Sequence, residues 1–434
     1  MTNRRQVLTS ILACDLRRTA FVVALVCALI VASTESTFAQ TFTLLYSFTG
    51  GTDGGTPYGG VIMDAAGNLY GTTYVGGSSG YGTVYMLPAS GNETVLHSFT
   101  GGPDGAYPKA GLTMDRAGNL YGTTVFGGHG FGTVFKLSRT GSNWILSTLY
   151  IFSGGTDGAE PFGGIIFGLD GAIYGTTDGG GTAGDGTLYK LVPPATFCKT
   201  VVCYWTETVL HSFTGGEDGM FPSAGLIQDS VGNLYGTTTY GGTPGSCSTF
   251  GCGTVFEYGA VGNYQVLYRF PPSGESGLWP YDGLLLDASG NLYGTANEGG
   301  DSQCVSDQGQ YYSCGVIFKL DTSGNETVLY AFTGPENGDG AFPYGALVRD
   351  SEGNFYVTTY QGGIAGGCGT EWGCGTVFEL DGSGSPHVLY AFPIAGQNGI
   401  LPEATLLRDA NGNLYGTADF GGINNSGTIF KLTP

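Results

Sequence analysis

The sequence predicts an all-β fold, a single seven-bladed β-propeller with four-stranded blades. The phrase Gly-Asn-Leu-Tyr-Gly-Thr occurs seven times, with substitutions in two copies, and its tyrosines fall at 70, 121, 174, 235, 293, 356 and 415. The repeat is therefore 51 to 63 residues long, the length of one propeller blade made of strands and turns. The chain also has 81 glycines in 434 residues and 13% aromatic residues, as expected for many short strands joined by tight turns.

Each repeat contains four segments with strand character. In the second copy they cover residues 111–115, 119–124, 132–137 and 148–152. A turn of the form Asp-x-x-Gly-Asn joins the first two, and its glycine and asparagine readily adopt the positive φ that such turns need. A longer loop containing Asp-Gly leads to the next repeat. The order of the segments predicts four antiparallel strands in each blade.

Seven prolines are predicted to begin the first strand of each blade, because proline lacks the amide donor of an inner strand residue. Counted from them, the blades start near 57, 108, 161, 222, 280, 343 and 402. Six blades are then complete and the seventh has three strands. Residues 42–48 resemble the fourth strands, so we expect them to complete blade seven. This would close the ring and protect its strand edges.

The first 39 residues have the features of a secretory signal peptide. Arg17 and Arg18 precede an apolar run from Phe21 to Ala32, and Thr37-Phe38-Ala39 is a suitable cleavage site. We therefore expect an exported protein, extracellular or in the cell envelope, whose propeller domain covers residues 40–434. An uncleaved membrane anchor is the alternative. No later apolar run approaches the length of about 18 residues that spans a bilayer, so we expect no membrane contact after signal removal.

The charge of the chain excludes some partners. The formal net charge is −20, and residues 1–39 carry +2, so the remainder carries about −22. A chain this acidic repels phosphate backbones, and we expect no nucleic-acid partner. We expect a monomer that binds an unknown carbohydrate or protein ligand.

Eight cysteines lie beyond the signal segment in close pairs, and an even number after an export signal favours disulfides. Each pair lies in a loop that is longer than its counterparts, so we interpret the bonds as local. Zinc is the alternative, but the spacings are irregular and no histidine accompanies them. The predicted pairs are Cys198 with Cys203, Cys247 with Cys252, Cys304 with Cys314, and Cys368 with Cys374.

The candidate ligand site lies at the mouth of the central channel, on the face that carries the longer loops. The residue after each proline varies and the next one is small, except at Asp282. A lone carboxylate there must be solvated or paired. Glu160 is a second exception, because the equivalent residues are mostly aromatic or apolar. The candidates are Tyr58, Lys109, Glu160, Tyr281, Asp282, Tyr344 and Glu403, with solvated rim residues as the alternative interpretation.

Metal, cofactor and catalytic patterns are weak in this sequence. The Asp-Gly loops hold Asp53, Asp104, Asp157, Asp218 and Asp339. Calcium is an alternative for them, yet one aspartate in each loop supplies few of the six to eight oxygens required. We expect no cofactor and no metal. The Gly-x-Gly patterns lack a βαβ context, and no nucleophile motif is present. A carboxylate pair in the channel is the one feature that would suit a glycosidase.

The repeated phrases resemble a known family. Gly-Asn-Leu-Tyr-Gly-Thr-Thr, Gly-Gly-x-x-Gly-x-Gly-Thr-Val-Phe-Lys-Leu and Val-Leu-Tyr-Ser-Phe-Thr-Gly-Gly are similar to the GloVer tandem repeat over residues 42 to 434. Members of that family are called choice-of-anchor proteins, which are exported and carry various C-terminal sorting tails. The resemblance implies export but no activity. Unlike those members, this chain is expected to have no such tail after Lys431-Leu432.

These observations favour a secreted, non-enzymatic binding module for a carbohydrate, a peptide or a cell-surface partner. An extracellular polysaccharide hydrolase or lyase is one alternative, and a structural scaffold of the envelope is another.

Overall fold

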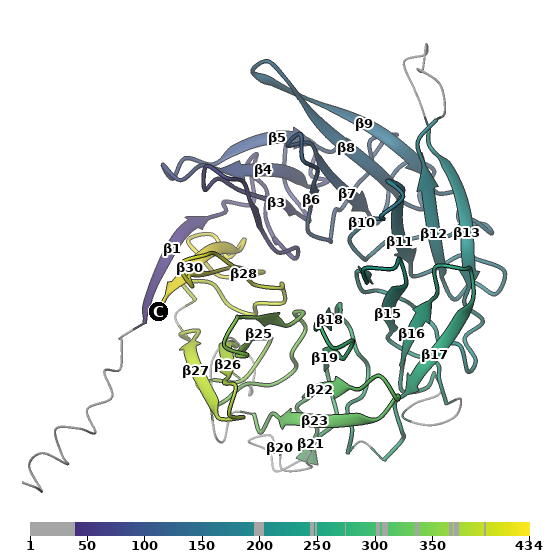
Figure 1. Cartoon of the computed structure of the whole chain (residues 1–434). Helices are drawn as coiled ribbons and strands as arrows, with labels where there is room; N and C mark the ends of the chain where they lie inside the picture. Colours follow the sequence, from purple (N-terminus) through teal and green to yellow (C-terminus); the bar gives the residue numbers. More distant parts are fainter. Residues whose placement is uncertain are drawn as a thin grey trace, which may run out of the picture. The chain divides into compact units, whose positions relative to one another are not determined.

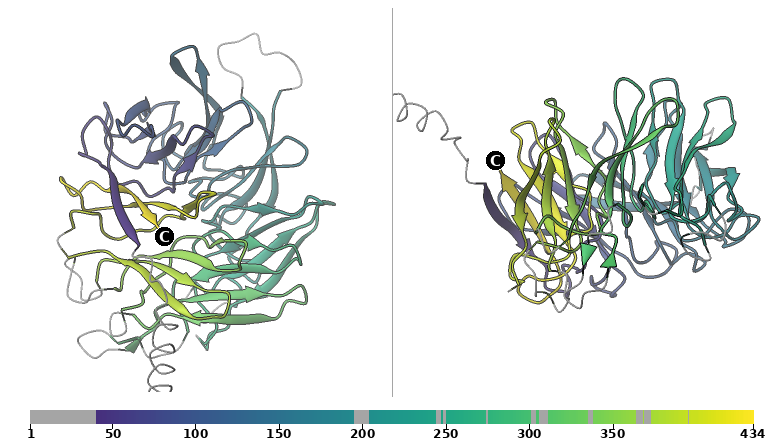
Figure 2. Two further views of the ribbon diagram at one scale, coloured as in Figure 1. Left: turned by 60° about the vertical axis from the view of Figure 1, so that its left-hand side comes forward. Right: turned by 90° about the horizontal axis from the view of Figure 1, so that it is seen from below.

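The computed structural model describes residues 40–434 except 195–203, 244–246, 248–249, 274, 301–303, 306–310, 335–337, 364–367, 369–372 and 395. The predicted signal peptide lies outside the described residues. Phe42–Thr433 form a ring of seven four-stranded antiparallel sheets, viewed along its axis in Figure 1 and edge-on in Figure 2. The fold is the predicted all-β, seven-bladed propeller. Among the described residues, no helix is long and apolar enough to cross a membrane.

The first four blades each take four consecutive strands. Blade one has β2 (Ile62–Met63), β3 (Leu69–Thr73), β4 (Thr83–Leu87) and β5 (Thr94–Ser98). Blade two has β6 (Thr113–Met114), β7 (Leu120–Thr124), β8 (Thr133–Thr140) and β9 (Asn143–Ile151). Blade three has β10 (Ile166–Phe167), β11 (Ile173–Thr177), β12 (Thr187–Val192) and β13 (Thr206–Ser212). Blade four has β14 (Ile227–Gln228), β15 (Leu234–Thr238), β16 (Thr254–Tyr258) and β17 (Tyr264–Arg269).

Blades five to seven complete the ring. Blade five has β18 (Leu285–Leu286), β19 (Leu292–Ala296), β22 (Val316–Leu320) and β23 (Glu326–Ala331), with a separate hairpin of β20 (Cys304–Val305) and β21 (Tyr311–Tyr312). Blade six has β24 (Val348–Arg349), β25 (Phe355–Thr359), β26 (Thr376–Leu380) and β27 (Pro386–Ala391). Blade seven has β28 (Leu407–Arg408), β29 (Leu414–Ala418) and β30 (Thr428–Thr433), with β1 (Thr41–Ser47) as its fourth strand.

The N-terminal strand closes the ring as predicted. β1 pairs with β30 at the outer edge of blade seven, where the purple and yellow ends of the chain lie side by side (Figure 1). The amide of Phe48 donates to the carbonyl of Gly427 at 3.0 Å, and the Phe48 side chain is fully buried. Phe42 stacks on Tyr390 of blade six with ring centroids 4.0 Å apart. The closing strand therefore also fixes the boundary between blades six and seven.

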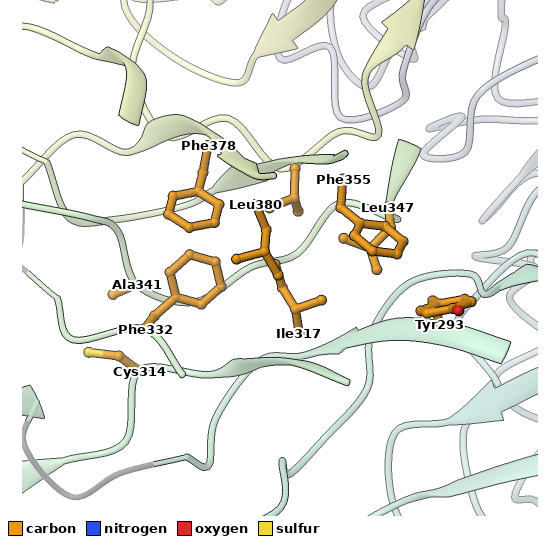
Figure 3. Close-up of a cluster of buried hydrophobic side chains, with 10 residues drawn as sticks. Tyr293, Cys314, Ile317, Phe332, Ala341, Leu347, Phe355, Phe378 and Leu380 are labelled. Atoms are coloured by element: carbon orange, nitrogen blue, oxygen red, sulfur yellow. The ribbon is translucent and has the colours of Figure 1, made fainter. Parts of the chain in front are cut away.

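The hydrophobic core lies between adjacent blades. Figure 3 shows the boundary of blades five and six, where Phe332 and Phe378 meet edge to face with centroids 4.9 Å apart. Ile317 and Leu380 pack beside them, and all four side chains are buried. Each blade thus buries an apolar face against its neighbour, and no blade is expected to fold without the next.

The residues of the repeated phrase make specific contacts within each blade, as blade five shows. The side chains of Asn291 and Tyr293 both donate to Asp287 in the preceding turn, at 2.8 and 3.0 Å. Leu292 is buried, and a Cβ on Gly294 would lie 2.6 Å from the ring of Phe318. The phrase is therefore conserved between copies of the repeat for structural reasons.

The threonine that ends the phrase links neighbouring blades. In every blade its hydroxyl donates to a backbone carbonyl beside the channel in the next blade, at 2.9 to 3.3 Å. The last bond, from Thr417 to Gly59, joins blade seven to blade one. The donors are Thr72, Thr123, Thr176, Thr237, Thr295, Thr358 and Thr417. A ring of hydrogen bonds therefore surrounds the axis.

The prolines do not begin the first strands. These strands are two residues long and start five residues after each proline, as Pro108 and β6 show. The proline ring packs instead on the glycine before the third strand of the preceding blade: a Cβ on Gly82 would lie 2.8 Å from Cδ of Pro108. The segment between the proline and the strand crosses the channel mouth, where no neighbouring strand pairs with it.

Candidate functional site

A cavity of about 690 Å³ lies on the axis of the ring. It is lined by the segments that follow the prolines, from all seven blades. Six of the seven predicted site residues line it: Tyr58, Lys109, Tyr281, Asp282, Tyr344 and Glu403. Glu160 is not part of the lining. Most of the candidates predicted from the sequence therefore lie in one cavity.

The backbone before each proline positions the mouth residues. All seven preceding residues have positive φ, between 54° and 58°, which is rare for residues other than glycine. In blade two, the amide of Tyr107 donates to Tyr81 of blade one at 2.8 Å, and its carbonyl accepts from Val125 at 3.2 Å. The seven residues are Thr56, Tyr107, Glu160, Phe221, Trp279, Phe342 and Leu401. Glu160 thus shares the backbone conformation of its six counterparts and does not line the cavity.

A second variable position lies next to the mouth, and its member Asp178 lines the cavity. It is the residue directly after the second strand, and its loop pairs with the loop before the proline in each blade, as at Ala106 and Phe126. The residues are Tyr74, Val125, Asp178, Thr239, Asn297, Tyr360 and Asp419. The sequence analysis overlooked them. Their variability directly after an almost invariant phrase is the pattern that could have identified them.

Lys109 is held between aromatic rings at the mouth. Its Nζ lies 5.3 Å from the ring centroid of Tyr58 and 4.9 Å from that of Phe162. An ammonium over an aromatic face is attracted by the ring quadrupole. Lys109 is the one lysine or arginine among the described residues of the lining.

A carboxyl pair lies at the boundary of blades seven and one. Burial raises the pKa of Glu403, although the charge of Lys109 opposes the shift. Burial and then the charge of Glu403 raise the pKa of Asp419, which is fully buried. Apart from the adjacent carboxyl of Glu403, neither side-chain oxygen of Asp419 has a hydrogen-bond partner among the described residues. The two carboxyls therefore favour sharing a proton over carrying two charges.

Asp178 of blade three is a third incompletely paired carboxyl. Its Oδ2 accepts from the hydroxyl of Ser223 at 3.1 Å, and its Oδ1 has no partner among the described residues. Burial raises the pKa of Asp178 to about 7, with Ser223 and Lys109 opposing and Glu160 adding to the shift. Glu160 therefore influences the site through its effect on the pKa of Asp178.

Asp282 spans the channel. Its carboxylate accepts from the amide of Ala346 at 2.6 Å and from the hydroxyl of Thr405 at 2.8 Å, which belong to blades six and seven. The amide of Gly283 also donates to it at 2.6 Å. Burial raises the pKa of Asp282, and these three bonds oppose the shift. Asp282 thus connects three blades across the axis, and its acceptor positions are occupied.

Tyrosines form walls on two sides of the mouth. Tyr281, Tyr344 and Tyr360 follow one another around the rim, with centroids 5.2 and 5.4 Å apart. Tyr58 meets Tyr74 edge to face at 5.2 Å. Burial followed by the charge of Glu403 raises the pKa of Tyr344 and of Tyr360 to about 12, so both keep their hydroxyl proton near neutral pH. The mouth thus offers flat apolar faces with hydroxyl donors beside carboxyls.

The aspartates of the Asp-Gly loops have a structural role, because they accept hydrogen bonds from residues of the preceding strand and loop. Asp53 accepts from the hydroxyl of Tyr46 at 3.0 Å and from the amide of Thr49 at 2.8 Å, and Asp157 repeats this arrangement with Tyr150 and Ser153. These carboxylates tie each fourth strand to the loop that follows. Among the described residues, no group of three or more histidine, cysteine, aspartate or glutamate residues is placed to hold a metal ion.

Two predicted disulfides are present, Cys247–Cys252 and Cys368–Cys374, with Cα atoms 5.3 and 5.5 Å apart. Cys314 is also disulfide-bonded. Cys198, Cys203 and the side chain of Cys304 lie outside the described residues. The two bonds close loops between second and third strands, on the face that carries the channel mouth.

Comparisons with known proteins agree with this architecture. The extracellular domain of a protein described as a hybrid two-component system from B. thetaiotaomicron is 12% identical, with a TM-score of 0.52; the match covers 91% of this chain and 41% of that one. A protein described as a 6-phosphogluconolactonase from Bacteroides uniformis is 12% identical, with a TM-score of 0.47, and the match covers 78% and 86% of the two chains. At this identity the first structure supports the fold alone. No curated protein matches the chain.

The repeats themselves identify the family. The model of the Gloeobacter/Verrucomicrobia repeat matches residues 32–207, 132–304 and 303–434, which together include every blade. This agrees with the resemblance found in the repeated phrases. The chain belongs to the Gloeobacter/Verrucomicrobia repeat family.

Proposed function

We propose that the protein is a binding module that takes a carbohydrate into the mouth of its central channel. The observation that carries the proposal is the cavity itself, about 690 Å³, with tyrosine faces and incompletely paired carboxyls on one rim. Ligand sites combine apolar walls with a few polar groups that fix orientation, and a sugar ring has one apolar face and a hydroxylated edge.

Two features support this function. The mouth residues differ between blades, whereas the residues that build the blades repeat, so the variation is concentrated at the cavity. A scaffold that used its outer strands would not need that pattern. Disulfides in the loops of this face support an exported protein, extracellular or in the envelope.

A polysaccharide hydrolase or lyase is the second candidate. It is favoured by Glu403 and Asp419, because a carboxyl with a raised pKa can donate a proton near neutral pH. Against it, the two carboxyls lie side by side, whereas glycosidases place theirs across the scissile bond. Binding without turnover is therefore the expected behaviour.

The test is binding and product release by the intact protein on a panel of polysaccharides. Tyr281→Ala and Tyr344→Ala should each weaken binding at least tenfold, because each removes a wall of the cavity. Tyr204→Ala is the matched control, since Tyr204 is exposed on the outer side of blade three. Product release would move the protein to the enzyme class. Binding unchanged in both wall variants would overturn the channel mouth as the site.

A further inference from the structure

One side of the channel mouth already holds an ammonium group. Nζ of Lys109 lies between the rings of Tyr58 and Phe162, at 5.3 and 4.9 Å from their centroids. No carboxylate lies within 4.0 Å of this nitrogen among the described residues. Aromatic faces therefore provide its immediate surroundings, and the mouth is suited to a nitrogen cation.

The blade-seven side of the mouth has the same kinds of groups without a cation of its own. Glu403 and Asp419 lie beside Tyr360, whose ring is 5.4 Å from that of Tyr344. Both carboxyls interact with the charge of Lys109 but form no ion pair with it. The described lining has no other lysine or arginine that could pair with them.

Asp419 makes this side incomplete. Its side chain is 0% exposed, and its oxygens meet no hydrogen-bond donor among the described residues except the carboxyl of Glu403. A buried carboxylate is costly unless a cation or several donors compensate it. A ligand ammonium bound at Glu403, which lines the cavity, would supply charge and donors to the pair. The proton shared by the two carboxyls would then leave to solvent.

An organic ammonium fits this site better than a metal ion does. Calcium requires six to eight oxygens, and the described residues include no group of three metal-ligating side chains here. An ammonium needs only a few acceptors and gains from neighbouring ring faces. The cavity is also large enough for several sugar rings rather than a single ion.

We propose that the Glu403 and Asp419 side of the channel mouth binds a free amino group, and that the glycan recognised by this protein is an amino sugar with an unacetylated nitrogen. The inference rests on the carbohydrate-binding function proposed above and names the chemical class of its ligand. Lys109 occupies the other aromatic slot, so it repels the ligand cation and limits the affinity.

The test compares glucosamine tetramers with N-acetylglucosamine tetramers in titration calorimetry on the intact protein. Wild type should bind the amine form at least tenfold more tightly, because acetylation removes the charge. Glu403→Gln should abolish this preference while keeping the shape of the side chain. Glu352→Gln removes the same charge from an exposed turn between β24 and β25, and it should leave both affinities unchanged.

Lys109→Gln provides a second test should Glu403→Gln fail to fold. Removing the resident cation should increase the preference for the amine form over the acetylated form. Equal binding of both tetramers by wild type would overturn the amine inference and leave the carbohydrate function standing. Binding of spermidine without either tetramer would support the amine inference and overturn the carbohydrate function. Binding of none of the three would overturn both.

Discussion

The turn carboxylates and the channel carboxylates of this propeller show opposite chemistry. Asp287, in the turn before β19, accepts four hydrogen bonds, from the amides of Ser289 and Asn291 and the side chains of Asn291 and Tyr293. Burial acts to raise its pKa, but these bonds lower it to about 2. Asp419, next to the channel mouth, has only the carboxyl of Glu403 as a hydrogen-bond partner among the described residues, and burial raises its pKa. The number of donors decides between the two outcomes.

The contrast distinguishes carboxylates that stabilise the fold from carboxylates that are available to bind a ligand. A carboxylate whose acceptor positions are filled supports the fold and has little capacity left for a ligand. A buried carboxylate with open positions destabilises the folded protein, and such deficits cluster at functional sites. The predictions below test this division, from the largest expected effect to the smallest.

The largest effect is expected from Asp287→Ala. It leaves the donors of Asn291 and Tyr293 without their acceptor, and we expect a loss of roughly 3 kcal/mol in the free energy of unfolding. Denaturant unfolding followed by tryptophan fluorescence measures the loss. Asp321→Ala is the control, because Asp321 accepts similar turn bonds at an exposed position without a tyrosine partner. An equal loss in both variants would contradict the role assigned to the buried network.

The pH dependence of stability should have two limbs. Burial, followed by the charges of Asp53 and Asp157 respectively, raises the pKa of Glu93 and Glu207 to about 7. Their protonated forms stabilise the fold fully below about pH 4.5, and this contribution is lost as the pH rises through about 7. The contribution of Asp287 is present above about pH 4 and is lost as the pH falls through about 2.

Thermal unfolding from pH 2 to 9 should therefore give the highest midpoint near pH 4 to 5. The double variant Glu93→Gln with Glu207→Gln should flatten the limb above pH 5 and leave the acid limb in place. A midpoint that rises between pH 5 and 8 in the wild-type protein would contradict the raised pKa values.

A smaller effect of opposite sign is expected from Asp419→Asn. The substitution keeps the size of the side chain and removes the charge from a fully buried site, so stability at pH 8 should rise by about 1 kcal/mol. Binding of an amine ligand should weaken at the same time. The measurement pairs calorimetric melting with titration on the same preparation. A stability loss comparable to that of Asp287→Ala would place Asp419 among the structural carboxylates.

The smallest effect is expected from Tyr293→Phe. It removes one hydroxyl donor to Asp287 and keeps the ring that packs against Phe355 at 5.0 Å. We expect a loss of about 1 kcal/mol in the free energy of unfolding, measured by the same denaturant titration. No loss at all would mean that the remaining donors satisfy Asp287 without the tyrosine.

The site was harder to predict than the fold. Tyr58, Lys109 and Glu403 were found because the residue after each proline varies between the copies, and all three line the cavity. Glu160 also breaks the pattern, but it does not line the cavity and shares the positive φ of its six counterparts. Asp419 was missed because the sequence does not show that the residue after β29 lies near the mouth. That becomes visible only in the structure, where the loop after β29 pairs with the loop before the proline of the same blade.

The sequence by itself determined the propeller: seven repeats, four strands in each, and closure by the N-terminal strand. These features follow from local periodicity and turn chemistry. Both can be recognised within a single repeat, and the other six repeats confirm them. Only the tertiary structure decided which carboxylates are satisfied. Asp282 finds its partners in two other blades, at Ala346 and Thr405, whereas in the described part of the chain Asp419 meets the carboxyl of Glu403 and no other donor. Burial and hydrogen bonding depend on contacts between blades, and the spacing of residues along the chain does not encode them.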